Sequence, residues 1–110
     1  MSLLSFLFGT KNDKVTVISA ADFKQQIENK NVQLIDVRTA GEFKSGAIKN
    51  ATNIDYLSGN FISKCDSLNK DKPVYLYCRS GARSARAAKK LSRAGFSKIY
   101  DLKGGISSYK

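Results

Sequence analysis

The chain has 110 residues, of which 42% are apolar and 25% are charged, and its formal net charge is +10. These values are typical of one globular domain that buries its own core, and they exclude a low-complexity or disordered chain. The absence of histidine excludes cysteine chemistry that relies on a histidine base. Two cysteines are too few for a disulfide framework, so we expect a reducing compartment, the cytoplasm.

Residues 1–12 form a short apolar tail in front of the predicted domain, which spans residues 13–110. The apolar run Leu3–Phe8 is bounded by Gly9 and lacks the basic start and small-residue cleavage site of a signal peptide. It is also far too short to cross a bilayer. We therefore expect a soluble protein without a transmembrane segment. The tail would dock on the domain, anchor weakly at a membrane interface or bind a partner.

Strand and helix patterns alternate along the rest of the chain. Runs of β-branched and aromatic residues predict strands at 15–18, 32–37, 51–54, 74–77 and 98–101. Helices are predicted from a cap at Ser19 through Ile27, over a short segment capped by Thr39 and Glu42, at about 60–68, and from Ser84 to a stop at Gly95. This alternation predicts a single α/β domain with a mainly parallel central sheet and helices on both faces.

Asp36 and Arg38 lie at the carboxyl end of the second predicted strand, and Glu42 follows in the next short helix. Two interpretations are open for these three side chains. They pair and hydrogen bond to fix loops beside a functional cleft, or they take part in catalysis directly. We favour the supporting role, because structural ion-pair networks are common near functional clefts.

Cys65 lies within the helix predicted at about 60–68. A small buried apolar residue is the ordinary explanation for a cysteine in such a helix. The alternative is a resolving or relay role toward the other cysteine, Cys78. We favour the structural role, because a disulfide requires Cα atoms within about 7 Å and the sequence does not place them.

Cys78 follows the predicted strand 74–77 and precedes a helix, which is where open α/β sheets bind ligands. Backbone N–H groups of a short loop can surround the sulfur, the helix N-terminus adds positive dipole charge, and arginines add full charges. The residues that can contribute are Arg79, Ser80, Gly81, Ala82, Arg83 and Ser84. We favour a reactive thiolate over the alternative, a buried core thiol beside solvated arginines.

Positive charge concentrates in the same part of the chain, since residues 72–110 contain ten lysines or arginines and one acid, Asp101. A positive field over the cleft would attract anionic substrates, and a solvated basic face is an equally good interpretation. Nucleic-acid binding is the competing use. We expect no nucleic-acid partner, because the basic residues lack the interleaved exposed aromatics of a single-strand binder.

Three blocks of residues lie in order along the chain, with the cysteine loop in the middle. They are Asp36-Val37-Arg38 with Glu42-Phe43, Gly46-Ala47-Ile48 and Asn50–Ile54; then Tyr77-Cys78-Arg79-Ser80-Gly81-Ala82-Arg83-Ser84-Ala85; and finally Leu102-Lys103-Gly104-Gly105-Ile106. Together these blocks resemble the rhodanese-like domain family. The resemblance extends from about Val15 to Lys110, and it implies a rhodanese-like fold over this part of the chain.

The resemblance implies sulfur transfer. In this family the loop cysteine takes a sulfane sulfur from an anionic donor, thiosulfate or a persulfide, and passes it to cyanide or a thiol. By resemblance, Cys78 carries the persulfide, the backbone from Arg79 to Ser84 surrounds the terminal sulfur, and Arg79 and Arg83 hold the donor. No metal or other cofactor is implied, and a sulfur-relay protein would fit as a partner.

Other functions stay open beside sulfur transfer. Cysteine-dependent phosphatases place five residues between cysteine and arginine, whereas four separate Cys78 from Arg83, so phosphatase or arsenate reductase activity is the weaker alternative. A non-catalytic binding or sulfur-carrier module is a further alternative, against which the presence of Cys78 argues. Ala47 stands where the family commonly has histidine, and Tyr109 where it often has tryptophan, so substrate preference can differ.

Overall fold

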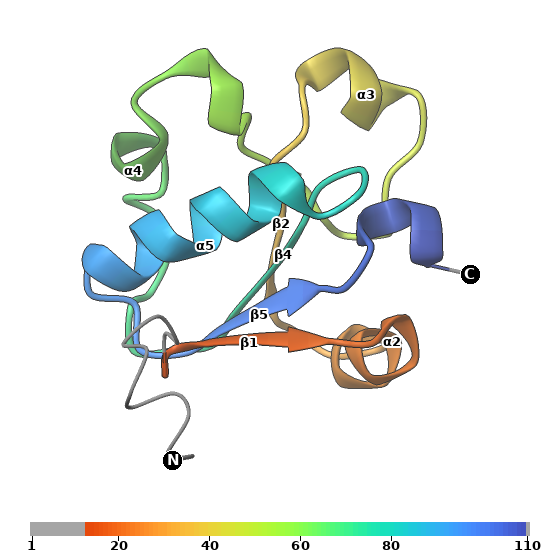
Figure 1. Ribbon diagram of the computed structural model, residues 1–110, viewed down its shortest axis with the longest axis horizontal. Helices are drawn as coiled ribbons and strands as arrows, with labels where there is room; N and C mark the ends of the chain where they lie inside the picture. Colours follow the sequence, from red (N-terminus) through yellow and green to blue (C-terminus); the bar gives the residue numbers. More distant parts are fainter. Residues whose placement is uncertain (1–12, 110) are drawn as a thin grey trace.

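Five parallel strands form the central sheet of the computed structural model, which describes residues 13–109 (Figure 1). They are β1 (Val15–Ile18), β2 (Gln33–Asp36), β3 (Thr52–Asn53), β4 (Val74–Tyr77) and β5 (Ile99–Leu102), in the spatial order β1-β5-β4-β2-β3. The middle strand, β4, is buried at every position, as its uncharged β-branched and aromatic residues predicted. The tail predicted for residues 1–12 lies outside the described residues.

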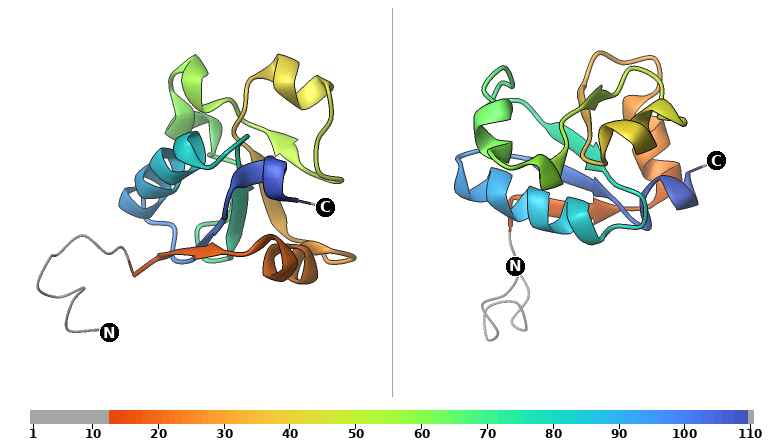
Figure 2. Two further views of the ribbon diagram at one scale, coloured as in Figure 1. Left: turned by 45° about the vertical axis from the view of Figure 1, so that its right-hand side comes forward. Right: turned by 90° about the horizontal axis from the view of Figure 1, so that it is seen from above.

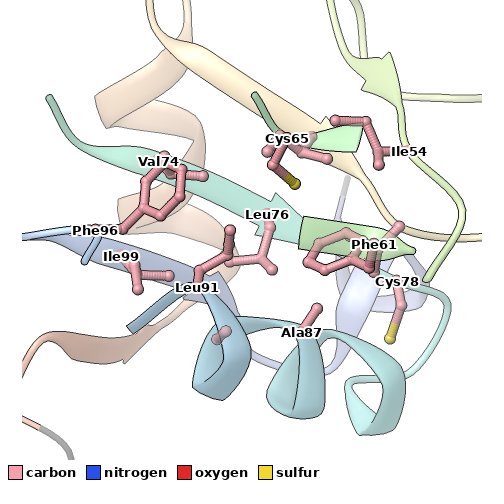
Figure 3. Close-up of a cluster of buried hydrophobic side chains, with 13 residues drawn as sticks. Ile54, Phe61, Cys65, Val74, Leu76, Cys78, Ala87, Leu91, Phe96 and Ile99 are labelled. Carbon is pink, nitrogen blue, oxygen red and sulfur yellow. The ribbon is translucent and has the colours of Figure 1, made fainter. Parts of the chain in front are cut away.

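Helices cover both faces of the sheet, which confirms the predicted architecture (Figure 2). The α-helices are α2 (Ala20–Ile27), α3 (Ala40–Lys44), α4 (Phe61–Lys64) and α5 (Ala82–Arg93), and the 3₁₀ helices are η1 (Tyr56–Ser58) and η2 (Gly105–Ser108). On one face, Phe23 of α2 packs in a cluster with Tyr75 and Tyr77 of β4. On the other face, α4 and α5 pack in a cluster with Val74 and Leu76 (Figure 3). Successive residues of β4 therefore contribute to two cores.

The helix predicted at about 60–68 is shorter in the structure, where α4 ends at Lys64. Beyond it, the Cys65 N–H bonds to the Ile62 carbonyl and the Leu68 N–H to the Cys65 carbonyl, so the chain continues in three-residue turns. These turns keep Cys65 buried without a regular helix. Between residues 13 and 109, no helix has the length and apolar character needed to cross a membrane.

The helix after the cysteine begins at Ala82 rather than at the predicted Ser84. Gly81 precedes it with a φ of 116°, a conformation that favours glycine. The Ala85 N–H then bonds to the Gly81 carbonyl at 3.1 Å, which closes the first turn. The connection from β4 to α5 is therefore only residues 78–81, and its tightness brings the helix N-terminus close to Cys78.

Candidate active site

Cys78 is the first residue after β4, at the edge of the sheet where the parallel strands end (Figure 1). Because the carboxyl ends of β2 and β5 lie at the same edge, the segments that follow Asp36 and Leu102 lie beside the cysteine loop. Hydrogen bonds join the loop to both segments, through Arg83 on one side and Ile106 on the other. The fold therefore brings the three sequence blocks to one place.

Hydrogen-bond donors surround the Cys78 sulfur. The Gly81 N–H donates to Sγ at 3.0 Å, and the Ser84 hydroxyl oxygen lies 3.5 Å from it. The backbone N–H groups of Ser80 and Ser84 also interact with the sulfur. Gly81 has a positive φ, and a loop that includes such a residue can direct successive N–H groups to one side and form an anion-binding nest.

Burial and hydrogen bonding shift the pKa of the Cys78 thiol in opposite directions. Cys78 is only 1% exposed, and burial raises the pKa of a thiol because it penalises the anion. The Ser84 hydroxyl and the N–H groups of Ser84, Gly81 and Ser80 outweigh that penalty, so the pKa of Cys78 lies below its usual value. The thiol is therefore buried like a core residue, yet its surroundings stabilise the thiolate.

The 3₁₀ helix η2 hydrogen bonds to the backbone of the cysteine loop. The Ile106 N–H donates to the Cys78 carbonyl at 2.9 Å, and the Ser107 N–H and hydroxyl both donate to the Arg79 carbonyl, at 3.2 and 2.8 Å. A Cβ atom at Gly105 would collide with the backbone of Arg79 and Ser80. The glycine is therefore required by this close approach, and the sequence alone indicated only a tight turn at this position.

Arg83 has an acidic partner that the sequence did not indicate. Its guanidinium donates to the two Glu42 carboxylate oxygens, at 2.6 and 3.0 Å. Glu42 also forms the predicted capping box with Thr39, which is confirmed. Arg83, followed by Thr39, lowers the pKa of Glu42 to about 2 against the opposing effect of burial. One carboxylate thus ties α3 to the first turn of α5.

Asp36 and Arg38 form a separate ion pair below the surface. The Arg38 guanidinium contacts both Asp36 oxygens, at 2.6 to 3.0 Å, and donates to the Gly46 carbonyl at 2.7 Å. Asp36 is fully buried and Arg38 is 5% exposed. The sequence grouped Glu42 with this pair, but Glu42 binds Arg83 because α3 lies beside the start of α5. The buried pair therefore fixes the loop between β2 and α3.

The remaining loop side chains point to solvent. Arg79 and Ser80 are exposed, and so is Ala82 in the first turn of α5. The Arg79 guanidinium forms no ion pair with any residue between 13 and 109. It is therefore the available side-chain cation of the loop, while Ser80 contributes its backbone N–H to the sulfur.

Three other features add no group to the candidate site. Cys65 is 2% exposed, and burial, followed by the charge of Asp66, raises its pKa to about 11, so it is protonated at neutral pH. Within the described part of the chain, no three histidine, cysteine or acidic side chains cluster as metal ligands would. A hollow of about 550 Å³ lies between the end of α2 and Tyr109, and the cysteine loop does not line it.

Comparison with known families agrees with this geometry. The model of the rhodanese-like domain matches residues 19–110, which is most of the chain. The chain belongs to the rhodanese-like domain family.

Curated relatives of this chain differ in length and in named activity. It is 42% identical to the uncharacterized protein YqhL of Bacillus subtilis over 73% of this chain and 62% of YqhL. It is 32% identical to the tRNA uridine(34) hydroxylase of Pelagibacter ubique over 91% of this chain, but it spans only 34% of that protein. It is 33% identical to the thiosulfate sulfurtransferase GlpE of Shewanella oneidensis, over 84% of this chain and 89% of GlpE.

A solved rhodanese-like structure shows the same fold. The rhodanese-like domain protein from Staphylococcus aureus superposes with a TM-score of 0.76 at 30% identity, over 86% of this chain and 91% of that one.

Ala47 and Tyr109, the two departures from the family pattern, lie outside the cysteine loop. Ala47 is exposed, and the Tyr109 ring packs edge-on against Phe23, with ring centres 6.4 Å apart. Tyr109 therefore helps to fix the chain after η2.

Substitution of Gly105 by alanine should raise the pKa of Cys78. The added Cβ would displace the backbone of Arg79 and Ser80, and the nest around the sulfur would open. Since one pKa unit changes the thiolate fraction about tenfold, we expect the rate of Cys78 alkylation at neutral pH to fall about tenfold or more. The control is Gly59→Ala, at a glycine that also has positive φ but has nothing within 4 Å of the added Cβ. Equal rates in the two variants would contradict the role of η2.

Substitution of Glu42 by glutamine should remove a pH-dependent contribution to stability. Arg83 holds the pKa of Glu42 at about 2 in the folded chain, below the value of about 4.3 in an unfolded one. The carboxylate therefore stabilises the fold fully above about pH 4.3, and this contribution is lost as the pH falls toward 2. Thermal unfolding, measured from pH 7 to pH 3, should show a higher unfolding temperature for wild type than for Glu42→Gln, and this difference should narrow in acid. Glu28→Gln, which loses an exposed 3.9 Å pair with Lys24, is the control. A difference in unfolding temperature that stays constant with pH would refute the role of Arg83.

Proposed function

We propose that this rhodanese-like domain is a sulfurtransferase that carries sulfane sulfur on Cys78 as a persulfide. The observation that carries the proposal is the set of N–H groups around a buried sulfur, with the Gly81 N–H at 3.0 Å from Sγ. Such a nest stabilises both the thiolate that must attack and the negative charge that a persulfide carries. The similarity to GlpE, which is named a thiosulfate sulfurtransferase and is spanned almost completely, supports the same reaction.

The reaction proceeds in two balanced steps. The Cys78 thiolate attacks the outer sulfur of thiosulfate, the bond between the two donor sulfurs breaks, and sulfite leaves with the bonding electrons. Cyanide or a thiolate then attacks the terminal sulfur of the Cys78 persulfide. The bond to Sγ breaks, and Cys78 leaves as the thiolate that began the cycle. Neither step involves a metal, a cofactor or net oxidation.

Arg79 and the loop backbone divide the binding of the anionic donor between them. Arg79 is exposed and unpaired by any acid within residues 13–109, so its guanidinium is available to the charged end of the donor. Arg83 is already bound to Glu42, and we assign it mainly to fixing the loop. The backbone of residues 79–84 would hold the terminal sulfur. The N-terminus of α5 adds its positive dipole end.

Other physiological donors and acceptors fit the same chemistry. A persulfide on another molecule would react as thiosulfate does, so a sulfur-relay protein is a fitting partner. A working thiolate also suits a reducing compartment, and we place the reaction in the cytoplasm. The similarity to tRNA uridine(34) hydroxylases covers about a third of those proteins, so their named reaction is not assigned to this chain.

Intact-mass measurement after incubation with thiosulfate tests this proposal. Wild type should gain the mass of one sulfur atom, and cyanide or a thiol should remove it. Cys78→Ser should gain nothing, whereas Cys65→Ser, the matched control at the other buried cysteine, should gain the sulfur as wild type does.

Other outcomes would point to the alternative functions. Hydrolysis of an aryl phosphate that depends on Cys78, without any added sulfur, would identify a phosphatase and overturn sulfur transfer. Neither activity in a folded protein would identify a binding module.

A further inference from the structure

Asp101 is a buried carboxylate without an obvious role. It lies on β5, is 3% exposed, and its Oδ1 atom has no hydrogen-bond partner. None of the ion pairs formed between residues 13 and 109 includes it. A buried and unpaired carboxylate is costly in its ionised form, so such a group calls for an explanation.

Few ionisable groups surround Asp101. Asp101 lies opposite Val17 of β1 and Leu76 of β4, on the face of the sheet that α5 covers. Tyr75 and Tyr77 of β4 belong to the cluster on the opposite face. The buried positions of α5 are Ser84, Ala87, Ala88 and Leu91, and its arginines and lysines are exposed or, for Arg83, partly buried against Glu42. Cys65 and Tyr56 also belong to the cluster on this face, and Cys78, one step along from β4, is the titratable group of that cluster that contacts Ser84.

Ser84 connects the two groups. Its hydroxyl oxygen lies 3.5 Å from the Cys78 sulfur, and the same hydroxyl lies near enough to the Asp101 carboxylate to lower the pKa of that group. In the present arrangement the single proton of this hydroxyl is donated to the Gly81 carbonyl, at 3.2 Å, so it must turn away from Gly81 to bridge the two groups. A hydroxyl has one proton to donate and two lone pairs to accept. Ser84 can therefore donate to the thiolate while it accepts from a protonated Asp101, or accept from the thiol while it donates to the carboxylate.

We propose that Asp101 is a positioning residue that shares one proton with Cys78 through the Ser84 hydroxyl. When Cys78 loses its proton, the S–H bond breaks and Ser84 gains that proton. Ser84 passes its own hydroxyl proton to Asp101, and the site carries one negative charge instead of two. Protonated Asp101 then donates to Ser84, which donates to the thiolate. This deepens the proposed function, which rests on the thiolate, but ionisation can be measured without any sulfur transfer.

The ionisation of Asp101 is consistent with this role. Burial raises the pKa of Asp101 to about 6, and the Ser84 hydroxyl opposes part of that rise. The carboxylate therefore takes up a proton close to neutral pH, where an ordinary aspartate would not. If the proton is shared, the two titrations belong to the pair, and an ionised Asp101 would raise the pKa of Cys78.

The test is a titration of the Cys78 thiolate by its ultraviolet absorbance, in a Cys65→Ser background so that one thiol remains. Asp101→Asn should lower the midpoint of this titration by about one pH unit or more. At a fixed pH below the midpoint, the fraction of Cys78 that is thiolate should then rise about tenfold or more. The amide can donate to Ser84 as a protonated Asp101 does, but it cannot ionise. Asp71→Asn, at an exposed aspartate, is the matched control and should leave the midpoint unchanged. An unchanged or raised midpoint in Asp101→Asn would overturn the proposal.

A second comparison tests the route through Ser84. In a Ser84→Ala background, Asp101→Asn should shift the Cys78 midpoint by less than half as much, because the bridging hydroxyl is gone. A shift of full size would show that Ser84 carries no coupling and would overturn the shared proton. Failure of thiosulfate labelling in a protein that shows these shifts would count against sulfur transfer and leave the coupling intact.

The unsubstituted Asp101 provides a readout that does not depend on a folded Asp101 variant. Carbon-13 NMR of the Asp101 carboxyl group in the Cys65→Ser protein should show a second inflection at the pH where Cys78 ionises. That inflection should disappear in Cys78→Ser. One inflection, unchanged by Cys78→Ser, would refute the coupling.

Discussion

The balance between burial and hydrogen bonding at one sulfur atom governs the candidate site. Burial of Cys78 to 1% exposure penalises its anion, and the N–H groups of the loop must outweigh that penalty. They do so only while the backbone from Cys78 to Gly81 keeps its shape. Gly81 at positive φ provides that shape, and η2 maintains it by binding the carbonyls of Cys78 and Arg79. Elements distant in sequence therefore serve one local electrostatic requirement.

Much of this arrangement follows from local sequence patterns. The strands Val15–Ile18 and Val74–Tyr77 coincide with their predicted ranges, because short uncharged β-branched or aromatic runs leave few alternatives. The capping box of Thr39 and Glu42 is also local, and it is confirmed. The place of Cys78 after the middle strand follows from the alternation of strands and helices, since a parallel sheet gathers its carboxyl-terminal loops at one edge.

Other contacts depend on how distant elements sit against one another, which the sequence pattern does not reveal. Glu42 and Arg83 are 41 residues apart, and they meet because α3 lies beside the start of α5. The conflict between a Cβ at Gly105 and the Arg79 backbone arises in the same way, from the approach of η2 to the loop. In the sequence, Asp101 stands out only as the one acidic residue of the basic segment 72–110. Its burial beside Ser84 requires the register of β5 against β4 and the packing of α5.

These long-range contacts change how charge is distributed at the site. Two free arginines beside the cysteine would have supplied the positive field alone, but Arg83 is paired with Glu42, and a buried acid, Asp101, lies on the neighbouring strand β5. The stabilisation of an anion on Cys78 therefore falls mainly to uncharged donors, the N–H groups and the Ser84 hydroxyl. Such donors are fixed by the backbone and need no reorganisation as charge moves onto the sulfur. Arg79 remains exposed, so in the proposed reaction stabilisation of the sulfur and recognition of the donor would rest on different groups.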